Sequence, residues 1–217
     1  MSTITTKSIV QINFPESQFK KVITDKNQIT LHHTVSGDNA QGVADWWKSN
    51  PERVATCIII EKSGVPFQCY SSQYYGYHLG VKAATFKKYN LEYKLLDMYS
   101  IGVELCSWGG LVKRGDKFYN AYAGEVKAKD VIEMDYRGYK YFDKYSDAQI
   151  NTLKELLIYW GKTYDIPLDY SEDMWEFNLD ALKGVPGIYS HTSYREDKSD
   201  LYPDQRIIDM LKSLKQK

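Results

Sequence analysis

The sequence predicts an α/β fold with a central mixed β-sheet. Short β-branched and apolar runs, typical of strands, recur along the chain, and amphipathic segments typical of helices lie between them. The chain has 217 residues, of which 43% are hydrophobic and 26% charged, as expected for one globular domain with its own core. We find no internal repeat, low-complexity segment or linker between domains.

Five segments have the pattern of β-strands. Residues 29–33 alternate in polarity, and residues 54–60 form a β-branched apolar run long enough only for a buried strand. Residues 65–70 follow a Ser-Gly turn and are expected to pair with that run as a hairpin. Residues 100–106 alternate, and residues 184–191 form a turn followed by a further strand.

Three segments have the pattern of helices. A short helix is expected over residues 41–50, and a final amphipathic helix over residues 204–214. The strongest helix signal begins at Ser146, which has capping-box spacing to Gln149, and ends before Pro167. Its apolar residues recur in steps of three and four: Ile150, Leu153, Leu157, Trp160 and Tyr164.

Two segments lack clear periodicity. Residues 1–27 are expected to form an irregular lead-in packed on a single domain of residues 28–217. Residues 109–145 are rich in Gly, Lys and Tyr, and we expect a long excursion with short strands. Because long loops in compact domains commonly have a function, this excursion is a candidate for lining a groove or holding a partner.

Composition excludes several classes of protein. Lys and Arg total 28, as do Asp and Glu, so the net charge is zero and no nucleic-acid partner is expected. The N-terminal segment MSTITTKSIVQINFPESQ has no uninterrupted apolar stretch, and no segment approaches the roughly 20 apolar residues of a membrane span. We therefore expect neither a signal peptide nor a membrane partner.

Cysteine and tyrosine usage narrows the classes further. Three cysteines without a CxxC motif exclude a disulfide scaffold and a cysteine zinc ribbon, and all three are expected to be reduced. Cys57, inside an apolar run, is expected to be a buried free thiol. The 19 tyrosines and 5 tryptophans fit core packing, the favoured interpretation, or an aromatic groove for sugar and peptide.

Histidine is rare, and its positions are informative. The four histidines are His32, His33, His78 and His191. His32 and His191 each end a predicted strand, where site residues collect, and Asp200 follows downstream. A single histidine is more often structural than a ligand, but two imidazoles and a carboxylate suit a four-coordinate Zn²⁺ with an open position for water.

Two further residues would complete a hydrolytic site. Glu104 lies on the non-core face of its predicted strand and would take a proton from the attacking water. Lys198 lies two residues before Asp200 and would stabilise a developing oxyanion. The HExxH motif is absent and no single spacing is diagnostic, so the residues alone leave a zinc hydrolase as one interpretation among several.

Four short motifs, in order along nearly the whole chain, are together more specific than any one of them. They are residues 29–34 (ITLHHT), 77–80 (YHLG), 100–105 (SIGVEL), and 189–191 (YSH) with 198–200 (KSD). In this combination the sequence resembles the type 2 N-acetylmuramoyl-L-alanine amidases, which share their fold with peptidoglycan recognition proteins and amidase-type phage lysozymes.

The resemblance assigns a role to each matching residue. It implies that His32, His191 and Asp200 bind one Zn²⁺ per chain. It further implies that Glu104 activates the zinc water and that Lys198 helps to stabilise the tetrahedral intermediate.

The resemblance also concerns the neighbours of these residues. His78 and Tyr77 are implied to contact the substrate, with a structural role as the alternative for His78, although Trp is usual at the position of Tyr77. Strand alternation sets His33 on the face opposite His32. Residues 201–204 (LYPD) depart from the Pro-Gly that often follows the family's last motif, and residues 109–145 are atypical of the family.

The resemblance implies a mostly parallel sheet flanked by helices, with zinc in a groove at the strand ends. The implied reaction is hydrolysis of the amide between N-acetylmuramic acid and L-alanine of the peptidoglycan stem peptide. The expected partner is bacterial peptidoglycan or muropeptides, and the expected state is a monomer.

The biological setting is predicted from the general pattern. A single domain without signal peptide or wall-binding repeats resembles a phage endolysin, made in the host cytoplasm and acting on the wall after release. Three alternatives remain: a non-catalytic peptidoglycan-binding module of the same fold, a cytoplasmic muropeptide-recycling amidase, and a zinc amidohydrolase or peptidase for small peptides.

Overall fold

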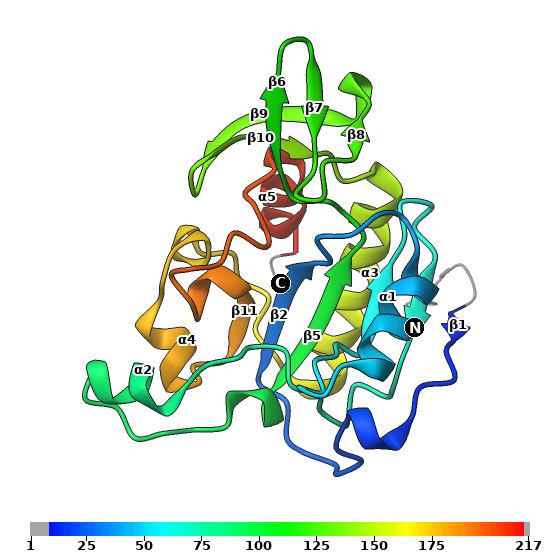
Figure 1. Cartoon of the computed structure of the whole chain (residues 1–217). Helices are drawn as coiled ribbons and strands as arrows, with labels where there is room; N and C mark the ends of the chain where they lie inside the picture. Colours follow the sequence, from blue (N-terminus) through cyan, green and yellow to red (C-terminus); the bar gives the residue numbers. More distant parts are fainter. Residues whose placement is uncertain (1–8, 215–217) are drawn as a thin grey trace.

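The centre of the molecule is a six-stranded β-sheet (Figure 1). The computed structural model describes residues 9–214. The strand order is β1-β4-β3-β5-β2-β11, and every neighbouring pair is parallel except β3 and β4, which form a hairpin. The sheet strands are β1 (Val10–Gln11), β2 (Gln28–His33), β3 (Ile58–Ile60), β4 (Pro66–Gln68), β5 (Ser100–Leu105) and β11 (Gly187–Ser190). This confirms the predicted mixed, mostly parallel sheet.

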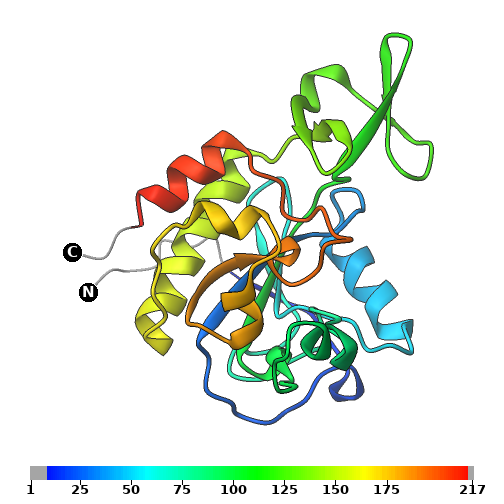
Figure 2. The same cartoon turned by 90° about the vertical axis from the view of Figure 1, so that its left-hand side faces the viewer.

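Helices cover both faces of this sheet. Figure 2 shows α3 and α5 on one face and α1 on the other. The α-helices are α1 (Ala40–Ser49), α2 (Ala83–Lys88), α3 (Asp147–Tyr164), α4 (Leu179–Lys183) and α5 (Gln205–Lys212). The 3-10 turns are η1 (Glu16–Gln18), η2 (Leu96–Met98), η3 (Ala128–Asp130), η4 (Glu172–Trp175) and η5 (His191–Ser193). No helix within residues 9–214 combines the length and apolar character needed to cross a lipid bilayer.

Helix α3 is fastened to the sheet by its first turn. The capping box of Ser146 and Gln149 is formed in both directions, as the sequence predicted. The Gln149 amide also donates hydrogen bonds to the carbonyls of Ile60 (2.9 Å) and Cys106 (3.0 Å), at the ends of β3 and β5. These two hydrogen bonds hold the first turn of α3 against the carboxyl-terminal ends of β3 and β5.

The apolar run at residues 54–60 is a strand over a shorter range than predicted. Only Ile58–Ile60 form β3, whereas Val54 makes an isolated bridge with Tyr77. The amide of Ala55 donates to the Tyr77 carbonyl (3.1 Å), so this part of the run pairs with a loop and not with a strand of the sheet. All three cysteines are buried and free, which confirms the expectation for Cys57.

The lead-in is more ordered than the sequence suggested. It contains β1 and η1, and the rings of Phe14 and Phe19 pack against Tyr70 in the core. Residues 1–8 of the expected lead-in and residues 215–217 of the expected domain lie outside the described residues.

The excursion at 109–145 forms a second sheet, which stands beyond the end of β5 (Figure 1). It is wholly antiparallel, in the order β8-β7-β6-β10-β9. Its strands are β6 (Gly110–Arg114), β7 (Lys117–Tyr119), β8 (Glu125–Val126), β9 (Val131–Tyr136) and β10 (Tyr139–Asp143). The carbonyl of Asp143 accepts hydrogen bonds from Ser107 (2.9 Å) and Tyr202 (3.0 Å), which attach the second sheet to the core.

Candidate metal centre

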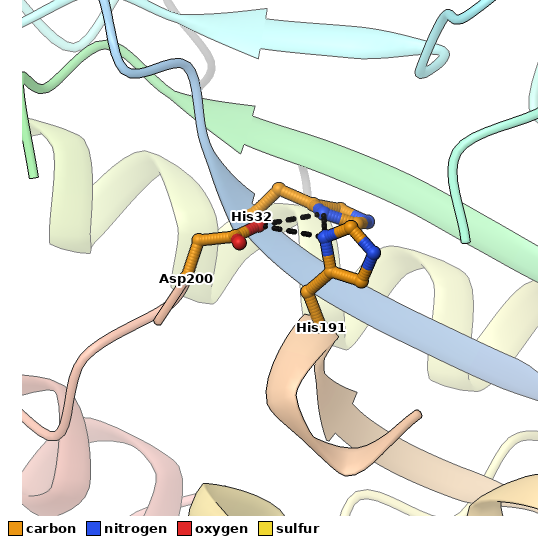
Figure 3. Close-up of side chains that lie close together, drawn as sticks. All are labelled: His32, His191 and Asp200. Atoms are coloured by element: carbon orange, nitrogen blue, oxygen red, sulfur yellow. Dashed lines mark hydrogen bonds and ion pairs between the residues drawn. The ribbon is translucent and has the colours of Figure 1, made fainter. Parts of the chain in front are cut away.

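Three predicted ligands converge at one edge of the central sheet (Figure 3). His32 is the last residue but one of β2, His191 directly follows β11, and Asp200 lies in the next loop. Because β2 and β11 are parallel neighbours, their carboxyl ends meet at the same edge. The Nδ1 atoms of the two histidines are 3.1 Å apart, and each is 3.0 Å from Oδ2 of Asp200.

Hydrogen bonds outside the group involve the second nitrogen of each ring. Nε2 of His191 is 3.0 Å from the Leu79 carbonyl, which can only accept, so this Nε2 carries a proton. Nε2 of His32 is 3.0 Å from Nδ1 of His78, and either nitrogen can be the donor. The group thus brings together two Nδ1 atoms and one carboxylate oxygen, which can bind a cation when the two nitrogens carry no proton.

The electrostatics of the buried site agree with this assignment. Burial, followed by the neighbouring charge of His191, lowers the pKa of His32 to about 4, so its imidazole is neutral at pH 7. Burial alone would raise the pKa of Asp200, but the interactions with His191 and His32 hold it well below its usual range. Two imidazole nitrogens and one carboxylate oxygen match the donor set of a Zn²⁺ site, in which ligand atoms lie about 2.0–2.2 Å from the metal.

Glu104 lies beside this group. It occupies β5 directly opposite His32 of β2, so both side chains leave the same face of the sheet. Its side chain is buried, and Oε2 has no hydrogen-bond partner among residues 9–214. Burial raises its pKa well above the usual range, whereas the charges of Asp200 and Lys198 act in opposite directions on it. The half-buried Lys198 is thus close enough to influence Glu104.

His78 is held behind His32. Its ring is 7% exposed, and the backbone amides of His78 and Leu79 donate to the buried carboxylate of Asp97 (2.7 and 3.0 Å). A side chain at Gly102 would come within 3.0 Å of the His78 ring, so the glycine makes room for it. Sequence reasoning missed both Asp97 and the Leu79 carbonyl. A carboxylate in a 3-10 turn and a backbone oxygen carry no periodic or motif signal.

Two other predicted residues lie apart from the group. Nδ1 of His33 is 2.8 Å from the Tyr145 hydroxyl on the side of the sheet covered by α3, which confirms that His33 faces away from His32. Tyr77 is half-buried, and its ring lies edge-on to Tyr75 with centroids 6.2 Å apart.

The match to a protein family spans this whole site. The sequence model of a family described as N-acetylmuramoyl-L-alanine amidase matches residues 24–203, which include every residue of the group and its neighbours. The chain belongs to this family. It is therefore an N-acetylmuramoyl-L-alanine amidase, an enzyme whose substrate class is peptidoglycan.

Solved structures share the fold of this amidase. The structure of PlyL has 13% sequence identity and a TM-score of 0.56, and the match covers 96% of this chain and 98% of that one. The N-acetylmuramoyl-L-alanine amidase LysC from Clostridium intestinale URNW has 14% identity and a TM-score of 0.52 (95% and 98% covered). A mutant endolysin from Bacillus subtilis has 15% identity and a TM-score of 0.53 (95% and 97% covered). The comparison with curated proteins finds no match.

Proposed function

We propose that this amidase uses one Zn²⁺, held by His32, His191 and Asp200, to cleave the bond between N-acetylmuramic acid and L-alanine of the stem peptide. The convergence of three potential ligand atoms within 3.1 Å of one another is the observation that carries the proposal. All three residues come from one chain, which supports action as a monomer. When bound, Zn²⁺ supplies Lewis acidity that polarises a carbonyl and acidifies water.

Two side chains of this chain would move protons and balance charge. Glu104 takes a proton from the attacking water and returns it to the departing amine of L-alanine, which leaves the lactyl carboxylate behind. Its free Oε2 supports this role, because no protein donor occupies the atom that must accept the proton. Lys198 places a positive charge near the oxyanion that forms on the scissile carbonyl.

The domain division belongs to the same proposal. Residues 28–217 would act as a single catalytic domain, on which the lead-in of residues 1–27 packs. The parallel pairing of β1 with β4 and the buried rings of Phe14 and Phe19 support this division for the described residues. Neither a nucleic acid nor a membrane is a partner in the proposal.

We further propose that the enzyme is a wall-lysing endolysin that acts on peptidoglycan after release from the cytoplasm. The shared fold with a solved endolysin supports this role. An enzyme for recycling would instead cut soluble muropeptides. Cleavage of soluble muropeptides without any cleavage of intact sacculi would therefore contradict the endolysin role.

Metal removal tests the proposed reaction. We expect the purified protein to expose new L-alanine amines on peptidoglycan without new reducing sugar ends. A chelator should abolish this release and added Zn²⁺ should restore it, because without the metal the site lacks its Lewis acid. Reducing ends would indicate a glycosidase. Cosedimentation with sacculi without any release would indicate a binding module.

His78 is proposed to position His32. Replacing a residue behind a metal ligand typically weakens metal binding about 10–100-fold, and we expect this for His78→Ala because Nε2 of His32 loses its partner. Zinc affinity, measured by competition with a chromophoric chelator, checks the effect. Tyr77→Phe is the matched control, since the Tyr77 ring lies against Tyr75. Unchanged zinc affinity in His78→Ala, with a raised KM, would instead favour the predicted substrate contact.

A further inference from the structure

A hollow of about 410 Å³ lies beside Glu104, between α1 and the loop that carries Trp108. Four aromatic residues line it, Trp46, Trp47, Trp108 and Tyr122, and we call it the aromatic hollow. It is continuous with the candidate catalytic site, because the buried Glu104 side chain with its free Oε2 forms part of its lining.

Two of these aromatic side chains are largely exposed, and Tyr122 is held in place by its neighbours. Trp46 is 60% exposed and Tyr122 75%, unusual for rings of this size unless they serve as contact surfaces. The Tyr122 ring lies edge-on to Trp108, with centroids 6.0 Å apart. Asn120 accepts hydrogen bonds from the amides of Tyr122 and Gly124 (both 2.9 Å), which fixes the turn between β7 and β8.

Trp108 is fixed from two sides. Its backbone amide donates to the Asp143 carboxylate at the base of the second sheet (2.8 Å). The indole also lies against Gly37, where a side chain would come within 3.1 Å of it. The wall of the hollow therefore joins the loop after β2, the loop after β5 and the second sheet.

The aromatic hollow has fewer charged lining residues than a second hollow of the molecule. Glu104 is the single charged residue among its lining residues, which otherwise include the hydroxyls and amide of Thr34, Ser36 and Asn39. A second hollow of about 290 Å³, the charged hollow, is lined by ionic side chains that include Lys82, Lys88, Arg195, Glu196 and Asp197.

The two hollows lie on opposite sides of the metal group. Gly80 lines the charged hollow and directly follows Leu79, whose carbonyl accepts a hydrogen bond from His191. In the sheet, β2 with His32 lies between β5, which carries Glu104, and β11, which precedes His191. Figure 1 accordingly shows α1 on the β5 side and α2 on the β11 side.

We propose that the aromatic hollow binds the sugars of the glycan strand, so that the stem peptide extends toward the charged hollow. This inference rests on the proposed function and gives the substrate an orientation. N-acetylmuramic acid is uncharged once its lactyl carboxyl is part of the scissile amide. Its C–H faces can pack on the rings, and its hydroxyl and acetamido groups can bond to Thr34, Ser36 or Asn39.

The stem peptide fits the aromatic hollow poorly. Its free carboxylates and amines would lose water there without gaining ionic partners, which is costly. The charged hollow, which is also lined by Tyr89, Phe177 and Tyr194, offers side chains of both signs to the same groups. They are Lys82 and the ion pairs Lys88–Glu196 (3.3 Å) and Arg195–Asp197 (2.6 Å). The second sheet thereby acquires a function, because Tyr122 extends the substrate surface beyond the central sheet.

Titration of the zinc-loaded protein with peptide-free glycan fragments of peptidoglycan, their lactyl carboxyls amidated so that the sugars are uncharged, tests this inference. We expect Tyr122→Ala and Trp46→Ala each to weaken binding roughly 3- to 10-fold, the size of one aromatic contact, and Tyr122→Phe to retain it. Zinc content should stay unchanged in all variants. Tyr93→Ala is the matched control, because Tyr93 is 51% exposed and lines a different surface.

Glycan affinity that is equal in Tyr122→Ala, Trp46→Ala and Tyr93→Ala would overturn the inference. The inference would also be overturned if Tyr122→Ala and Trp46→Ala weakened binding of the isolated stem peptide but not binding of the glycan. Because binding of a peptide-free glycan needs no hydrolysis, the two proposals can fail separately. A protein that binds glycan through these rings but releases no amines contradicts the proposed function alone.

Discussion

Asp200→Ala is expected to abolish zinc retention and amidase activity together. The substitution removes the single carboxylate of the group and leaves two imidazoles, and a site with two ligands holds zinc poorly. The loss of affinity should exceed the roughly 10–100-fold effect typical of residues behind the ligands. His191→Ala should behave alike. Elemental analysis of each purified variant, together with amine release from peptidoglycan, measures both effects.

His33→Ala is the matched control for the two ligand variants. It removes a buried imidazole from the next position of β2, but on the opposite face, where Nδ1 of His33 meets the Tyr145 hydroxyl. Loss of that buried hydrogen bond should cost about 1–3 kcal/mol of stability while zinc content is retained. Zinc retained by Asp200→Ala, or lost by a folded His33→Ala, would contradict the ligand assignment.

Strong local signals made much of the central fold predictable. The capping box of α3 and its apolar repeat fixed that helix closely, and the apolar runs located β2 and β5. The helices α2 and α4 have six and five residues, too short for a periodic pattern to emerge. In the structure Asn178 caps the start of α4 and Gly184 ends it in the left-handed conformation, whereas the sequence pattern predicted Gly184 in a turn before a strand.

The second sheet could not be derived in the same way. One of its inner pairings joins β6 to β10, strands that are distant in sequence, and Tyr141 lies opposite Leu111. Residues 109–145 have too few buried positions for alternation to define a face, and Gly, Lys and Tyr fit loops as well as strands. Its strands were expected, but their arrangement was not.

The candidate site was predictable where residue type and strand ends sufficed. Both histidines were assigned to strand ends that prove to be adjacent, and Asp200 joins them. The hydrogen bonds of these histidines to His78 and to the Leu79 carbonyl were not predictable, because they depend on ring orientation in the folded chain. The position of Tyr122 was not predictable either, because Tyr122 lines the aromatic hollow only through the arrangement of the second sheet.

Glu104→Ala is expected to keep zinc and lose most of the reaction rate. Glu104 is not one of the three converging ligands, so the metal group remains complete. Without the carboxylate, no side chain takes the proton of the attacking water, and general acid–base terms of this kind are worth about 10²–10⁴-fold in kcat. Zinc content and kcat, measured on the same preparations, check the two halves of the prediction.

Glu104→Gln distinguishes a role of Glu104 in proton transfer from a role in folding or in metal binding. The amide keeps the shape of the buried side chain but cannot accept and return the proton, so it should lose a similar rate. A buried carboxylate whose Oε2 has no partner among the described residues is costly to fold around, so neither thermal stability nor zinc content should fall. Glu52→Ala, at an exposed carboxylate, is the control for both. A zinc-free but folded Glu104→Gln protein would instead make Glu104 part of the metal site.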